Sequence, residues 1–380
     1  MMVNMRTGKV KHGGEVTMNA RERFHAMMQF GQTDRLPFWL LESITEQAVR
    51  SWCGQGMPQG VEITEYIGVD PLLQVHLSAD PIPNFVAHTI DADERFVTAI
   101  DRYGFTVKTL KQERISPTCY YYIKGSVENR SDWEAMKKRY DPSDIRRFGP
   151  EWSPELLDYY RNASCPVTLV LPWGPGRGIK NGYMLGLEGF LDKVMNEPVL
   201  LEDMFEFWAD FLIRLTTPLL EQVPIDLLFI DEDGIAFRNG PIVSPEIYRK
   251  IWIPPMRRFV EHAYAHGVRF VGQYTAGHVA PLIPALMSIG VNLFAPLEVA
   301  ADMDARTLRK EYGRDLLLMG NIGRGALMGG IDAIDRELDA KTTWLVEQRG
   351  FIPAVDDQIL PDITFDSYMH YVNRIKSWKP

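Results

Sequence analysis

Short apolar runs alternate with longer amphipathic stretches along most of this chain. Asn19–Phe30 predicts a helix, because Asn19 is a good N-cap and apolar residues then recur on one face. The apolar runs predict eight buried strands, at Leu36–Leu40, Leu72–His76, Pro166–Leu171, Leu227–Asp231, Arg269–Gln273, Val291–Ala295, Asp315–Met319 and Phe351–Ala354. Amphipathic stretches predict further helices at Glu188–Asn196, Pro198–Gln222, Pro245–His266, Val279–Ser288, Ala305–Tyr312, Asp332–Gln348 and Phe365–Trp378.

Strands that are continuous apolar runs, each followed by a helix, are typical of a parallel sheet covered on both faces. Eight such units predict an α/β fold of the (β/α)8 TIM-barrel type, with a doubly wound sheet as the alternative. No Gly-x-Gly-x-x-Gly opens a helix after the first strand, so a dinucleotide site gains no support. We expect residues 1–18 to be a disordered lead-in and 19–380 to form a single barrel domain.

Residues 80–125 interrupt the alternation after the second strand. Turn signals at Asp91–Asp93 and Tyr103–Gly104 separate short runs that are typical of antiparallel strands. These runs are Phe85–Ile90, Arg95–Ile100, Thr106–Lys111 and Cys119–Ile123. We therefore expect an antiparallel β-insertion beside the barrel, which either shapes the mouth of the active site or serves as an oligomer contact.

Composition narrows the class of protein. The 380 residues carry a net charge of −9 without any long run of Lys or Arg, which argues against nucleic-acid and anionic-membrane partners. No apolar stretch is long enough to span a bilayer. Three cysteines, at 53, 119 and 165, are an odd number and form no Cys-x-x-Cys. We therefore expect a protein of the reducing cytoplasm.

In a (β/α)8 enzyme the reactive side chains follow the strands. Asp231-Glu232-Asp233 gives the strongest signal, because three carboxylates directly after an apolar strand are costly unless they face water, cations or a ligand. Crowding raises at least one pKa and suits general acid or base work, although a solvated loop of capping acids would have the same sequence. His278 either shuttles protons or merely opens a helix. Asp357 follows the last strand and could join Glu232 and His278 around a metal ion such as zinc.

Other strand ends offer candidates for substrate binding. The glycine-rich stretch Trp173–Gly178 predicts either an anion cradle, in which Arg177 holds a carboxylate or phosphate, or a flexible lid. Aromatic residues such as Trp39, Trp173 and Tyr274 would line a pocket or fill the core. The remaining polar residues that come after predicted strands are Glu42, His76, Glu298 and Asn321.

Several motifs together resemble one superfamily over most of the chain. They are Asn19–Phe24, Asp34–Pro37, Gly240–Glu246, Gly290-Val291, Pro296–Glu298, Gly320–Ile322 and Gly350–Pro353. The chain resembles the uroporphyrinogen decarboxylase-like superfamily, which includes corrinoid-linked methyltransferases. The resemblance implies a (β/α)8 barrel, in agreement with the strand count.

The chain departs from two branches of that superfamily. True uroporphyrinogen decarboxylases carry Arg-Gln-Ala-Gly-Arg after the first strand, where Leu40–Thr45 here contains no arginine. Thiol-methylating members bind zinc through His-x-Cys-Gly after the fifth strand, where Tyr274–Gly277 here contains no cysteine. The resemblance is therefore to an uncharacterised branch.

The departures favour a third role known in the superfamily, in which a methyl group passes from a small methylated compound to the corrinoid of a separate protein. That role needs an acid at the leaving atom. We expect Glu232, Asp233, Tyr274 and His278 to be catalytic. We expect substrate contacts from Trp39, Glu42, His76, Trp173, Arg177, Glu298, Asn321 and Asp357. Relatives commonly pair, so a homodimer is expected. The alternatives are a decarboxylase or lyase that acts on another acid, and a non-catalytic binder of a tetrapyrrole or corrinoid partner.

Overall fold

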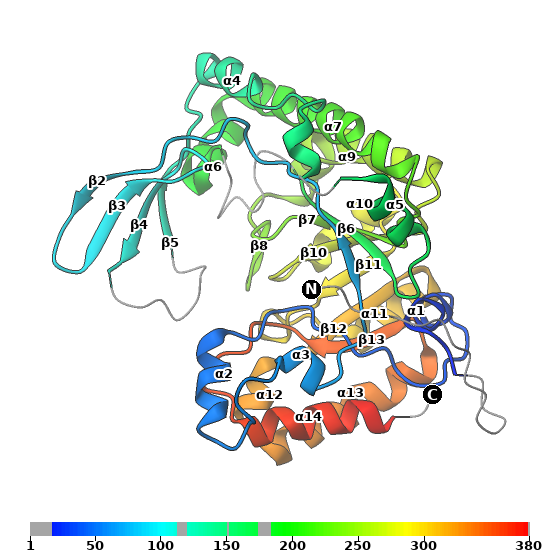
Figure 1. The fold of residues 1–380 in the computed structure, drawn as a ribbon. Helices are drawn as coiled ribbons and strands as arrows, with labels where there is room; N and C mark the ends of the chain where they lie inside the picture. Colours follow the sequence, from blue (N-terminus) through cyan, green and yellow to red (C-terminus); the bar gives the residue numbers. More distant parts are fainter. Residues whose placement is uncertain (1–16, 112–119, 150–151, 174–183, 379–380) are drawn as a thin grey trace.

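A computed structural model describes residues 17–111, 120–149, 152–173 and 184–378. Within these ranges the centre of the molecule is one parallel sheet of seven strands, in the order β1-β6-β7-β10-β11-β12-β13 (Figure 1). Its strands are Leu73–Val75 (β1), Val167–Pro172 (β6), Leu227–Asp231 (β7), Phe270–Thr275 (β10), Leu293–Pro296 (β11), Leu317–Ile322 (β12) and Phe351–Val355 (β13). All seven correspond to predicted strands, and the α/β class is confirmed.

The predicted first strand, Leu36–Leu40, is not formed. Its backbone is bonded elsewhere: the Asp70 carboxylate accepts from the Phe38 N–H, and the Asp70 N–H donates to the Phe38 carbonyl, both at 2.9 Å. Just beyond it, Ile44 makes a single parallel bridge to Ile359. An apolar run alone cannot distinguish such a buried extended segment from a sheet strand. The described sheet therefore has seven parallel strands where eight were predicted.

The antiparallel insertion is confirmed as a four-stranded sheet in the order β2-β3-β4-β5. Its strands are His88–Ala92 (β2), Phe96–Ile100 (β3), Thr106–Leu110 (β4) and Tyr120–Lys124 (β5). The sheet projects from the body of the molecule (Figure 1). Phe105 and Val107 are buried at its base, so the insertion is anchored by its own apolar residues. A two-stranded sheet is formed by Ala236–Phe237 (β8) and Gly240–Pro241 (β9).

Helices pack around the parallel sheet. They are Ala20–Met28 (α1), Glu46–Cys53 (α2), Ile63–Tyr66 (α3), Arg130–Lys137 (α4), Pro154–Arg161 (α5), Gly186–Asn196 (α6), Pro198–Leu220 (α7), Pro245–Ile251 (α8), Ile253–Ala265 (α9), Ile283–Met287 (α10), Ala305–Tyr312 (α11), Arg324–Met328 (α12), Ile331–Gln348 (α13) and Phe365–Ser377 (α14). The predicted helix Pro245–His266 divides into α8 and α9 at Trp252, because Pro254 and Pro255 lack the N–H groups that would continue it.

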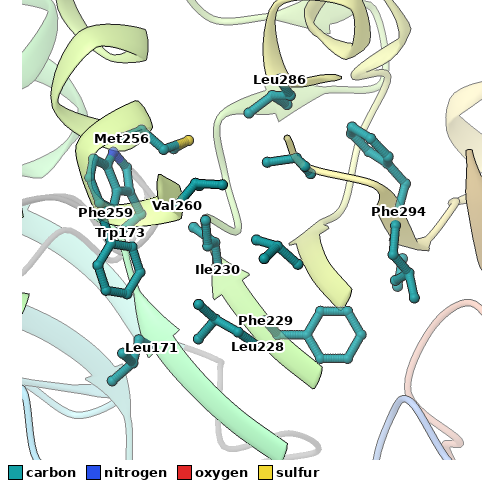
Figure 2. Close-up of a cluster of buried hydrophobic side chains, with 14 of the residues drawn as sticks. Leu171, Trp173, Leu228, Phe229, Ile230, Met256, Phe259, Val260, Leu286 and Phe294 are labelled. Carbon is teal, nitrogen blue, oxygen red and sulfur yellow. The ribbon is translucent and has the colours of Figure 1, made fainter. Parts of the chain in front are cut away.

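The core lies between the sheet and its helices. Figure 2 shows side chains of α9, among them Met256 and Val260, near Ile230 of β7. Phe259 of α9 stacks on Trp173, with ring centroids 5.9 Å apart. No helix in the described ranges is long and apolar enough to cross a membrane.

Candidate active site

The alternation of side chains along β7 and β10 sorts the predicted site residues into two groups. Phe229 of β7 packs edge-on against Tyr274 of β10, at 5.8 Å between ring centroids, so these side chains share one face of the sheet. Asp231 lies two residues beyond Phe229 and is the register partner of Tyr274. Glu232 comes next in the chain and turns to the opposite side, toward α8. The acid triplet therefore divides between the two faces.

Tyr274 and Glu42 form the central pair of the site. Glu42 follows the extended segment that replaces the predicted first strand, and Tyr274 lies near the C-terminal end of β10. The Tyr274 hydroxyl donates a short hydrogen bond to Oε1 of Glu42 and lies 3.3 Å from the Leu41 carbonyl. Both side chains are half-buried. The fold thus brings together two predicted residues that are separated by more than two hundred positions.

The surroundings of Glu42 favour its protonated form. Burial raises the pKa of Glu42 to about 7, against the lowering effect of the Tyr274 hydrogen bond. The negative charges of Asp357, Asp233 and Asp231 contribute to this raised value, because each opposes ionisation of a nearby carboxyl. Burial and the Glu42 charge likewise raise the pKa of Tyr274 well above that of an ordinary tyrosine. Glu42 can therefore donate a proton near neutral pH.

Glu232 belongs to a separate buried network. Its Oε2 accepts from the Tyr248 hydroxyl at 2.7 Å and from Nε2 of Gln273 at 3.0 Å. The side chain is 2% exposed, and burial raises the pKa of Glu232 to about 8. The backbone N–H of Glu232 donates to the Tyr274 carbonyl at 3.0 Å. Glu232 therefore contacts the backbone of the central pair's tyrosine, while its carboxyl lies on the other face.

The predicted metal ligands Glu232, His278 and Asp357 are not gathered. His278 Nδ1 lies 2.9 Å from the Ala301 carbonyl, and Asp357 is exposed and accepts from the N–H of the next residue. Within the described ranges no three His, Cys, Asp or Glu side chains are placed to share a metal ion. The described residues therefore do not fit the predicted zinc site.

Carboxylates hold the loops around the pair. Asp233 Oδ1 accepts from the Ala276 N–H at 3.3 Å, and Glu298 Oε2 accepts from the Gly277 N–H at 2.8 Å. Gly277 has φ +85°, and a Cβ there would lie 2.5 Å from a backbone oxygen, so this close approach requires glycine. The two acids therefore fix the turn that directly follows Tyr274.

Four other predicted residues have different surroundings. Asn321 is fully buried and bonds three backbone groups between residues 297 and 305, so it holds a loop. Trp39 stacks on a phenylalanine of α1 at 5.0 Å, and Trp173 is fully buried against α9, so both fill the core. His76 is exposed and lines a cavity beside β1. Arg177 lies outside the described residues.

Sequence reasoning missed the arginines that line this same cavity. Arg102, Arg146 and Arg147 come from the insertion and from the 3₁₀ helix Ile145–Phe148. None of the three arginines comes directly after a strand of the parallel sheet, so the ends of those strands do not indicate them. No spacing in the sequence relates them to Asp231, which lines the cavity at the end of β7.

One solved structure agrees with this architecture. A methyltransferase from Methanosarcina mazei has a similar structure, with a TM-score of 0.61 at 12% identity, over 94% of this chain and 98% of that one. A B12-independent methionine synthase from Shewanella sp. W3-18-1 aligns with a TM-score of 0.43 at 10% identity, over 90% and 96%. Curated proteins yield no match.

The sequence profile of uroporphyrinogen decarboxylase (URO-D) matches residues 180–378. This stretch contains Tyr274 and the motifs from Gly240 onward, whereas the motifs around α1 lie before it. The match covers more than half of the chain and confirms the resemblance seen in the sequence. The chain belongs to the uroporphyrinogen decarboxylase family.

Proposed function

We propose that this protein is a methyltransferase that moves a methyl group from a small methylated compound to the corrinoid of a partner protein. The Tyr274–Glu42 pair carries the proposal. Its carboxyl is held beside the strand ends of the sheet, with its pKa raised to about 7. Demethylation of an oxygen, nitrogen or sulfur atom needs such an acid, because the leaving atom departs more easily once it is protonated.

The reaction balances with Glu42 as the acid. The corrinoid, as the methyl acceptor, supplies the electron pair that takes the methyl group. The pair of the broken bond stays on the leaving atom, which receives the proton of Glu42. Tyr274 holds Oε1, and within the described ranges Oε2 has no hydrogen-bond partner, so we assign the proton to Oε2. Asp357 beside it is exposed, so the acid lies within reach of a large acceptor.

The other residues of the site act on the acid. Burial keeps Glu42 protonated, with a smaller contribution from the charges of Asp231, Asp233 and Asp357. Tyr274 fixes the direction of its carboxyl. Asp233 and Glu298 hold the turn that carries Tyr274. The chain is similar in fold to a protein described as a methyltransferase, and methyl transfer is the class of reaction that we propose. Cytoplasmic location and a homodimer stay predictions.

The test is transfer of a labelled methyl group from a panel of O-, N- and S-methyl donors to free cob(I)alamin. We expect transfer from one donor class, and a loss of about 10²- to 10⁴-fold in Glu42→Gln. The matched control is Glu46→Gln, because Glu46 is 88% exposed on α2 and pairs with the surface arginine Arg50. Transfer at the wild-type rate by a folded Glu42→Gln protein would contradict the assignment.

Decarboxylation of another acid is the second candidate, and the URO-D match favours it. A carboxyl with a pKa of about 7 would also protonate the carbanion left by loss of carbon dioxide. Measuring labelled carbon dioxide released from carboxylic acids separates the two reactions, because methyl transfer releases none.

A further inference from the structure

A cavity of about 460 Å³ is lined in part by Asp231, the register partner of Tyr274 in the Tyr274–Glu42 pair. Its floor comes from the ends of three neighbouring strands, through Gln74, Pro172 and Asp231. Asp231 joins the cavity to the pair, because it is the register partner of Tyr274 and raises the pKa of Glu42. The volume falls within the range of about 300–1,000 Å³ that is usual for small-molecule sites.

Besides Asp231, the lining of this cavity contains three arginines and one further carboxylate, that of Asp80. Arg102 stands in the turn between β3 and β4, stacks over the Tyr103 ring at 4.8 Å and pairs with Asp80 at 2.5 Å. Arg146 pairs with Asp144, which does not line the cavity. Both guanidinium groups are more than half exposed. Arg146 keeps N–H groups beyond those used in its ion pair, since a guanidinium has five.

Arg147 adds a buried positive charge to the same lining. It is 1% exposed, and its guanidinium donates to the carbonyls of residues 78, 80, 139 and 141. In the part of the chain that the structure describes, no carboxylate forms an ion pair with it. Burial disfavours this charge, and an anion in the adjoining space would stabilise it in addition to the nearby charges of Asp144, Asp141 and Asp80.

We propose that the cavity binds a carboxylate or phosphate group of the substrate, so that the methyl donor is a small anionic molecule. Arg102 and Arg146 donate to the anion, and Arg147 adds its charge through the wall. The methylated atom then lies at the Asp231 end, beside the acid. This inference rests on the proposed function for the reaction, while the anion site is testable by binding alone. It also gives the insertion a role, since Arg102 belongs to it.

The experiment is calorimetric titration of the whole protein with three probes of similar shape: benzoate, phenyl phosphate and benzyl alcohol. We expect one anion per chain and binding of the neutral alcohol weaker by about tenfold or more. The two anions tell a carboxylate site from a phosphate site. Raising the salt concentration should weaken the binding of the anions.

The variants are Arg102→Gln, Arg146→Gln and the double variant, which should lose about tenfold or more in anion affinity. Both side chains are exposed, so the fold should survive, and circular dichroism checks this. Arg50→Gln is the matched control, because Arg50 is 62% exposed on α2, away from the cavity. Arg147 is left intact because its four bonds hold the wall together.

Two results would overturn the inference: neither anion binds at up to about 10 mM, or the double variant binds them as tightly as the wild type. Failure of the proposed function looks different. Anion binding that depends on the arginines, in a protein that transfers no methyl group, would leave the site standing and remove the reaction. Methyl transfer from neutral donors alone would leave the reaction standing and remove the anion site.

Discussion

Replacing Tyr274 by Phe should raise the pKa of Glu42. The variant loses the hydrogen bond from the Tyr274 hydroxyl to the Glu42 carboxyl. This bond is strongest when the carboxyl is ionised. Hydrogen bonds to charged groups contribute about 1.5–3 kcal/mol. One pKa unit corresponds to about 1.4 kcal/mol, so the pKa of Glu42 should rise from about 7 by about 1 to 2 units. The burial and the neighbouring carboxylates that raise the pKa remain in the variant.

The assay is a pH titration of glutamate side-chain carboxyls by ¹³C NMR in labelled protein. The signal of Glu42 is assigned by its loss in Glu42→Gln. Tyr159→Phe is the matched control, because Tyr159 is 57% exposed on α5. A wild-type midpoint near the ordinary glutamate value, or the same midpoint in Tyr274→Phe, would refute the argument from burial and hydrogen bonding.

Three further predictions concern stability. Between about pH 4.5 and 8 the raised pKa of Glu232 makes the wild type lose about 1.4 kcal/mol of unfolding free energy per pH unit, and Glu232→Gln should flatten this fall. Urea unfolding near both ends of this pH range measures the fall. The same fall in both proteins would contradict the prediction. Asn321→Ala should lower the free energy of unfolding, measured in urea, by about 3 kcal/mol or more, because it leaves three buried backbone groups without partners. A decrease below about 1 kcal/mol would argue against this role of Asn321. Gly320→Ala should lower the melting temperature or prevent folding, because its Cβ would lie 1.9 Å from the Pro296 carbonyl oxygen; an unchanged melting temperature would count against it.

The parallel sheet could be predicted because its strands are buried on both faces and therefore appear as apolar runs. Leu227–Asp231 and Phe351–Val355 lie where the pattern placed them, within a residue. Leu36–Leu40 has the same pattern but not the same structure. Its backbone partner is Asp70, more than thirty residues away, and no local pattern carries that information.

The candidate site could be predicted in part. Tyr274 and Glu42 were both found because each comes just after a predicted strand, but their contact depends on the tertiary fold. Glu232 and Asp233 were both predicted to be catalytic, because a triplet of acids does not show which side chain turns inward. Only the register of β7 against β10 places Asp231 beside Tyr274, and only the packing of α8 places Tyr248 against Glu232. The arginines of the cavity wall come from the insertion and a short helix, which carry no motif.

The pH dependence of methyl transfer tests the central claim most directly, namely that Glu42 donates the proton to the leaving atom. A required acid must be protonated, so the rate of a single transfer should be highest at low pH and fall as pH rises through about 7. Tyr274→Phe should move this fall upward by about 1 to 2 units, in step with its NMR titration. A rate that is flat across neutral pH, or a fall that does not move in Tyr274→Phe, would contradict the account.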